Sequence, residues 1–226
     1  MISSERDPRI QRTHTLGKSD RTKLKCIEAS IEILSEGGMD ELSFEEIAVR
    51  AGLSRQLVKN YFPVKSDLVH EAALRVRKQF QEFVIRRMLR QAVSEAVIEE
   101  YITSSLKWPR EYRKEAKFWM VYFHLCATSP KFRKTNTELV ALGHDRIAAL
   151  LSEVHAPGSF SQKEIHVKAK MIQIQVTGGI VSILTEKSPF ELAELDAAIV
   201  ESCRAIGKFG NKVAGKITSE VKSVLD

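Results

Sequence analysis

The sequence predicts an all-α fold, with a small N-terminal unit of three helices followed by a larger helical domain. Apolar residues recur at helical spacing through most of the chain. The prolines and paired glycines lie between these periodic segments, where they would end helices. Alternating apolar and polar runs bounded by turn residues, the pattern of β-strands, are absent.

Composition narrows the class of protein before any motif is considered. The chain has 226 residues, 43% of them hydrophobic, which is enough for one or two compact domains. No apolar run reaches the roughly 18 residues that a membrane span needs, and the polar N-terminus does not look like a secretory signal. Three scattered cysteines, none in a CxxC pair, do not form a disulfide framework. We therefore expect a reduced, cytoplasmic protein without a membrane partner.

The first predicted helix covers residues 19–36 and ends at Gly37-Gly38. Its apolar positions repeat with helical spacing at Ile27, Ile31 and Leu34. A second, short helix begins after Ser43, since Ser43 followed by Glu46 is a capping-box pattern.

A tight turn and a third helix follow directly. Gly52 supplies the turn, and Ser54 caps a helix that runs to about Tyr61. Pro63 ends this helix, and a long helix is expected from about residue 64 or 66 to 90. The remaining helices are predicted near 94–107, 109–128, 131–155, 161–185 and 190–206. For residues 207–226, a final helix and a frayed tail both fit the pattern.

The second and third helices form a helix-turn-helix pattern. Two short helices joined by a three-residue turn cross closely, so a small residue is needed at their contact, and Ala48 supplies it. Gly52 can adopt the positive φ of the turn. Both helices also contribute apolar anchors: Phe44, Ile47, Ala51, Leu53, Val58 and Phe62. Few chance pairs of helices would satisfy all these requirements.

The outer face of the third helix carries side chains suited to DNA. Arginine can bind guanine through two hydrogen bonds, and glutamine or asparagine can bind adenine in the same way. Lysine and serine suit phosphates, as do helix N-termini. We therefore predict that the DNA contacts come from Ser43, Ser54, Arg55, Gln56, Lys59, Asn60, Tyr61 and Lys65. The alternative is an ordinary solvated helix face.

Charge is sorted along the first 65 residues, although the net charge of the whole chain is only +6. Residues 1–25 carry seven basic and three acidic groups, residues 26–46 carry seven acids and no Lys or Arg, and residues 47–65 carry four basic groups and no acid. If the acidic segment faces away, the two basic segments can share a surface that meets phosphates. Solvated helix faces would explain the same pattern.

Residues 21–70 resemble the N-terminal domain of TetR-family transcriptional regulators. The resemblance rests on Gly37-Gly38-Met39, on Ser43 to Ala48, on Ala51 to Ser54, and on the ending Tyr61-Phe62-Pro63-Val64-Lys65-Ser66-Asp67-Leu68. The chain departs from the family at Lys59, where a tyrosine usually contacts the DNA backbone. Lys59 can still reach a phosphate.

The resemblance implies a ligand-responsive homodimer that binds a double-stranded, pseudo-palindromic operator, most often as a repressor. It implies a helix-turn-helix DNA-binding domain at residues 19–65 and a helical ligand-binding and dimerisation domain at 66–226. Dimer contacts are expected from the helices near 161–185 and 190–206. Residues 1–18 would form a basic flexible arm, which either reaches DNA or remains a solvated tail.

A site for a small-molecule effector is expected in the larger domain. Two segments combine apolar and polar side chains, as a ligand cavity requires: residues 108–128, rich in aromatics, and residues 171–180. The candidate ligand-binding residues are Trp119, Phe123, His124, Met171 and Gln175. Core and dimer packing would equally account for such residues at helical spacing.

No catalytic, metal or cofactor site is predicted, so we do not expect an enzyme. The segment 210–217 (GNKVAGKI) approaches a phosphate-binding P-loop, but Ile217 stands where that loop needs Ser or Thr. HExxH and GxSxG motifs are missing. Two rival interpretations are a helical protein-interaction module without sequence-specific DNA binding, and a helical enzyme with an unrecognised site.

Overall fold

The computed structural model describes residues 17–91, 94–185 and 189–209, and within these ranges the chain forms α-helices and no β-strand. The helices are α1 (Lys18–Glu41), α2 (Phe44–Ala51), α3 (Arg55–Tyr61), α4 (Lys65–Met88), α5 (Ser94–Glu111), α6 (Arg113–Thr128), α7 (Pro130–Val154), α8 (Gln162–Thr185) and α9 (Pro189–Gly207). The predicted all-α class is confirmed.

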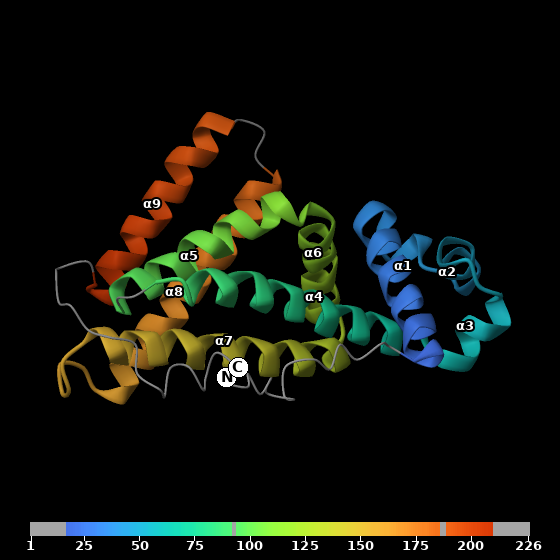
Figure 1. The fold of residues 1–226 in the computed structure, drawn as a ribbon, viewed down its shortest axis with the longest axis horizontal. Coiled ribbons are helices and arrows are strands. Elements are labelled where there is room, and N and C mark those ends of the chain that lie inside the picture. The colour runs from blue at the N-terminus through green and yellow to red at the C-terminus, as the bar shows by residue number, and fades with distance from the viewer. Residues whose placement is uncertain (1–16, 92–93, 186–188, 210–226) are drawn as a thin grey trace, which may run out of the picture.

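The helices form a small N-terminal unit and a larger body (Figure 1). Helices α1 to α3 lie together at one end, and α4 runs from this unit into the body. Helix α6 packs against α1, so the body touches the N-terminal unit at a second place. Helices α8 and α9 pack against each other and lie toward the opposite end of the molecule.

Helix α1 breaks where the glycine pair predicted its end. Its assigned range continues to Glu41, but Gly38 has φ +73° and ψ −159°, which is not helical. Glycine takes this backbone conformation without the cost that a side chain would add. The short segment after the break leads into α2 and places Leu42, which is almost fully buried, in the core.

The boundary expected at Pro109 is wrong. Pro109 lies inside α5, which continues to Glu111, and α6 begins only after Tyr112. Pro109 has no N–H to donate to the Ser105 carbonyl, so the helix continues past it at the cost of one backbone hydrogen bond. Trp108 and Pro109 are both buried, so tertiary packing holds this turn in place.

The boundaries of α7, α8 and α9 lie within one residue of the predicted ones. The body core is rich in aromatic rings, with Trp108, Tyr122, Phe83 and Phe118 all fully buried. Three predicted features lie outside the described residues: most of the basic arm, the P-loop-like segment 210–217, and the tail after residue 209.

Candidate nucleic-acid interface and ligand cavity

The turn between α2 and α3 has the predicted geometry. Gly52 has φ +64° and ψ 43°, and the Leu53 amide donates to the Ala48 carbonyl at 2.9 Å. Ala48 is 3% exposed and Val58 is fully buried, so the two helices touch through a small residue and a branched one. The predicted helix-turn-helix is confirmed.

Serine hydroxyls cap both helices of the motif. Ser43 Oγ accepts from the Glu46 amide at 3.0 Å, and Ser54 Oγ accepts from the Leu57 amide at 3.2 Å. A side-chain oxygen at this position satisfies a backbone N–H that has no partner within the helix. The caps fix where each helix starts, and burial of Val58 decides which side chains of α3 face outward.

The structure brings the predicted α3 side chains together on one exposed surface, which we call the α3 face: Arg55, Gln56, Lys59 and Asn60. Gln56 Nε2 donates to Asn60 Oδ1 at 3.0 Å, so the two amides meet one helical turn apart. Tyr61 is half-buried at the end of the helix and packs against the core.

One acidic group approaches this face, contrary to the expectation drawn from the acid-free segment. Glu45 of α2 places Oε2 3.9 Å from Arg55 Nε. Both side chains are more than half exposed, so the pair is weak and easily exchanged for a phosphate or a base. Lys59 lies over the ring of Phe44, with Nζ 5.4 Å from its centroid.

Two other basic residues of the motif have protein partners. Lys65 Nζ donates to the Leu42 carbonyl at 3.0 Å and remains exposed. Arg50 is held by two acids, with Nη1 2.6 Å from Glu36 Oε2 and Nε 2.7 Å from Glu46 Oε1. These hydrogen bonds raise the pKa of Arg50 further above its ordinary value. Part of the acidic segment thus serves to hold α2 against α1.

The body contains a cavity of about 600 Å³ between α4, α5, α6, α7 and α8. Trp119 and Phe123 line it, with their rings stacked at a centroid distance of 5.7 Å. Both were predicted as ligand contacts, and the structure brings them together on one wall.

The other three predicted ligand residues do not line this cavity. His124, Met171 and Gln175 are exposed, while Gln173, Ile174 and Thr177 form the α8 wall. Adjacent helical residues point about 100° apart, so an error of one or two positions selects a different face.

Sequence reasoning missed several lining residues, among them Phe80, Trp108, Arg77 and Arg146. Trp108 is fully buried, and its ring meets that of Phe80 edge-on at 5.3 Å. The sequence carries no clear signal for these arginines, because polar neighbours surround both: Arg75, Lys78 and Gln79 near Arg77, and His144 and Asp145 before Arg146.

Several polar atoms at the cavity have no hydrogen-bond partner. They are the buried Nε of Arg146, Nε1 of Trp108 and Oε1 of Gln173. Burial lowers the pKa of Arg146, and burial together with the positive charge of Arg146 lowers the pKa of Arg77. Burial raises the pKa of Tyr101, another lining residue, to about 12, so its hydroxyl stays protonated at neutral pH.

Neither a metal site nor a membrane-spanning helix is present in the described ranges. No group of three or more His, Cys, Asp or Glu side chains there could hold a metal ion. No helix there is long and apolar enough to cross a membrane. Cys26, Cys126 and Cys203 are free, buried and on three different helices.

Known proteins resemble this chain in sequence, mainly in its N-terminal half. Residues 27–72 match the description of bacterial regulatory proteins of the tetR family. The HTH-type transcriptional regulator BetI of Escherichia coli (strain K12 / DH10B) is 24% identical over 110 residues, which cover 48% of this chain and 56% of BetI. The chain thus aligns with only about half the length of the curated relatives it matches.

Solved structures resemble the fold over most of the chain. A transcriptional regulator from Rhodococcus sp. Rha1 has a TM-score of 0.72 at 17% identity, over 84% of this chain and 98% of that one. A protein described as a transcriptional regulator from Saccharomonospora viridis, in complex with choline, has a TM-score of 0.69 at 18% identity, over 79% and 93%. At these identities the likeness concerns the fold alone. The helix-turn-helix of this chain is thus similar to the N-terminal domain of tetR-family regulatory proteins, matched over residues 27–72, and the rest of the chain shares the fold of the solved transcriptional regulators.

Proposed function

We propose that this protein is a dimeric, ligand-responsive DNA-binding transcriptional regulator, and that it acts as a repressor. Binding of a small molecule in the cavity would release a pseudo-palindromic operator. The observation that carries the proposal is the α3 face, whose four polar side chains are exposed at a fixed angle by the Gly52 turn and the Ser54 cap. Arginine, glutamine, lysine and asparagine together can read base edges and hold phosphates.

The surface of α8 supports the dimer. Val167, Met171 and Ile174 lie on one face of this helix and are 52%, 46% and 60% exposed. Helix α9 lies beside it and exposes the small residues Ala198 and Ala205. A row of exposed apolar groups next to a helix with small side chains suits a symmetric helix-to-helix interface.

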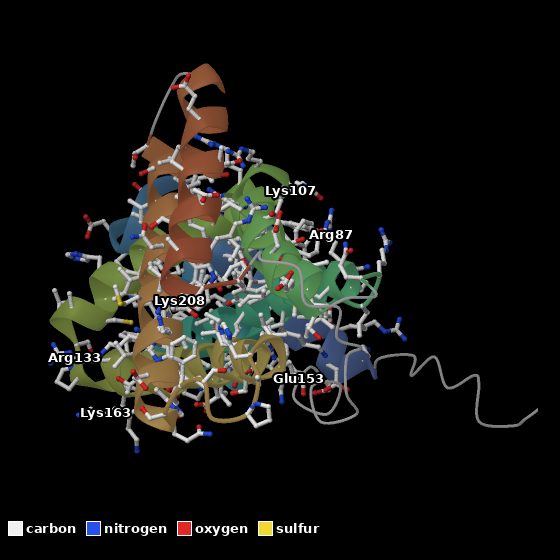
Figure 2. The ribbon with its side chains drawn as sticks, turned by 90° about the vertical axis from the view of Figure 1, so that its left-hand side faces the viewer. Arg87, Lys107, Arg133, Glu153, Lys163 and Lys208 are labelled. Atoms are coloured by element: carbon white, nitrogen blue, oxygen red, sulfur yellow. The ribbon has the colours of Figure 1, made fainter. Side chains whose placement is uncertain are left out.

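Figure 2 looks onto this end of the molecule, with α8 and α9 in front. A dimer formed here would leave the two α3 faces free for successive major grooves, roughly 34–36 Å apart.

The cavity supports the response to a ligand. It is lined by α4, which leads directly to the helix-turn-helix, and by α6, which packs against α1. A ligand that favours one arrangement of these helices would shift the spacing of the two α3 faces. Only a difference in ligand affinity between the two arrangements can produce this effect.

Selection of bound sequences from random duplex DNA tests the proposal, followed by affinity measurements over a salt series. We expect enrichment of a pseudo-palindrome and a strong fall in affinity with salt. Arg55→Ala and Gln56→Ala should each cost about 1–3 kcal/mol on the selected site and relax its sequence preference. Lys65→Ala should weaken binding to all sequences alike.

Lys163→Ala is the matched control, because it removes one positive charge from an exposed position at the other end of the molecule. It should leave DNA affinity and salt dependence unchanged. Binding without salt dependence, or equal losses for Arg55→Ala and Lys163→Ala, would favour the rival interpretation of a protein-interaction module.

A further inference from the structure

We propose that the cavity selects an organic anion with an apolar body, such as an aryl or alkyl carboxylate, over an organic cation. This inference rests on the proposed role of the cavity as the effector site and names the chemical class that it takes.

The charges at the cavity all have one sign. Arg77 of α4, Arg146 of α7 and Lys170 of α8 line it, and no Asp or Glu of the described residues does. His144 also lines it, but burial and the positive charge of Lys170 lower the pKa of its imidazole, which favours the neutral form. Three cations without a lining carboxylate leave the cavity positive until an anion enters.

The acids closest in sequence to Arg77 and Arg146 are Glu82 and Asp145, and both lie near other basic groups. Glu82 borders a smaller neighbouring groove, where its Oε1 lies 3.9 Å from Lys78 Nζ. Asp145 is exposed and lies 4.0 Å from His166. Arg77 and Arg146 also border the groove that contains Glu82, but among the described residues no ion pair joins either arginine to Glu82 or Asp145, and neither carboxylate lines the main cavity.

Hydrogen-bond donors without partners mark where the anionic group would lie. Arg146 Nε is buried and unbonded, and so is Nε1 of the fully buried Trp108, which can only donate. Buried donors without acceptors are costly, and a bound carboxylate would satisfy them through charge-assisted hydrogen bonds. Arg77 and Arg146 also repel each other, and an anion near both would relieve this repulsion.

The rest of the wall requires an apolar body on the ligand. Phe80, Trp119 and Phe123 contribute rings, and Leu139, Val140 and Ile180 contribute aliphatic surface. The volume of about 600 Å³ is within the range of sites for small organic ligands. A bare inorganic anion would leave this surface uncovered.

A cationic ligand is the alternative to consider. The protein from Saccharomonospora viridis with a similar fold is in complex with choline, which is a cation. Aromatic faces attract quaternary ammonium groups. In this chain, however, such a group would lie among two guanidinium groups and a lysine, with no lining carboxylate to offset them. Repulsion from three nearby cations opposes the attraction of a ring face for such a group.

Intrinsic fluorescence provides a direct test, because the chain has two tryptophans and both line the cavity. The full-length protein is titrated with three ligands of one shape: 4-phenylbutyrate, its uncharged amide, and 3-phenylpropyltrimethylammonium. We expect the carboxylate to bind about tenfold more tightly than the amide, or better, as charge-assisted hydrogen bonds to arginine predict. The cation should bind most weakly.

Variants identify the groups responsible. Arg146→Gln should lose about tenfold or more in affinity for the carboxylate while affinity for the amide stays the same. Arg90→Gln is the matched control, since Arg90 is an exposed arginine beyond the end of α4 and does not line the cavity. If circular dichroism shows that Arg146→Gln does not fold, Arg77→Gln takes its place.

Titration of the unaltered protein with the three ligands tests the inference without any variant. Equal or tighter binding of the amide or the cation overturns the inference, and so does failure of the carboxylate to bind at millimolar concentration. These titrations contain no DNA, so their failure is distinct from failure of the proposed function. A protein that binds its operator but not the carboxylate would refute this inference alone.

Discussion

Lys131 at the start of α7 contacts Asp67 in the first turn of α4, with Nζ 2.7 Å from Oδ1. The same ammonium donates to Ser66 Oγ at 2.9 Å, and Thr135 lies 3.3 Å from His70 one turn further along. Helix α7 also lines the cavity, and α4 begins directly after the helix-turn-helix. This contact therefore joins the cavity wall to the base of the proposed DNA-binding unit.

We predict that Lys131→Met weakens the communication between ligand and DNA. Anion binding should persist, but the reduction of operator affinity caused by 4-phenylbutyrate should shrink by roughly two- to tenfold, the range for residues that couple two sites. The measurement is operator affinity with and without the ligand. Lys163→Met serves as control, and an unchanged ligand effect in Lys131→Met would contradict the prediction.

Gly52→Ala should destabilise the N-terminal unit. A Cβ at Gly52 meets no atom within 4 Å, so the cost comes from the positive φ alone, about 1–2 kcal/mol. Gly52→Asn should cost less, because asparagine tolerates this conformation. Chemical denaturation of the three proteins gives the comparison. Equal stability of the Ala variant and the unaltered chain would refute the strain argument.

Acidic substitutions in the exposed apolar row of α8 should separate the proposed dimer into monomers. Val167→Glu and Met171→Glu each place a carboxylate on the proposed interface, opposite its own copy if the axis is twofold. Sedimentation should show monomers at micromolar concentration, with loss of operator affinity. Val49→Glu is the control for oligomeric state, since Val49 is 68% exposed on α2, at the other end of the molecule. A variant that remains dimeric would exclude this surface.

Arg146→Leu should stabilise the ligand-free protein. A partly buried guanidinium beside Arg77 opposes folding, and an apolar side chain removes this penalty, with a gain of about 1–2 kcal/mol. Thermal and urea unfolding measure the gain, and the exposed Arg90→Leu should stay within about 0.5 kcal/mol of the parent. A less stable Arg146→Leu would show that Arg146 has a favourable partner in the protein.

Stability should fall at alkaline pH. Burial raises the pKa of Cys203 from 9.0 to about 11 in the folded state. Between these values the unfolded chain loses the thiol proton first, so the free energy of unfolding falls as pH rises from 9 toward 11. Tyr101 acts in the same direction at higher pH. Urea unfolding should show a shallower decline for Cys203→Ala, and a flat profile in the parent would contradict the shift.

The local features of this protein were predictable from its sequence. Helix periodicity, the Ser43 and Ser54 caps, and the Gly52 turn each depend on residues a few positions apart, and the structure shows all of them. The α3 face followed from the same information, because the apolar Val58 marks the buried side of this short helix and the polar residues lie on the other side. Local hydrogen bonds and backbone preferences suffice for such features.

Tertiary structure decided what depends on residues far apart in the chain. Helix α5 continues through Pro109 because Trp108 and Pro109 are packed in the core, and Glu45 reaches the α3 face from the preceding helix. The cavity joins Arg77 to Arg146 and Trp108 to Trp119 across several helices, and the α8 wall uses Gln173 rather than the predicted Gln175. The rotation of a helix about its axis is set by packing against its neighbours, and the periodicity of α8 alone leaves that angle open.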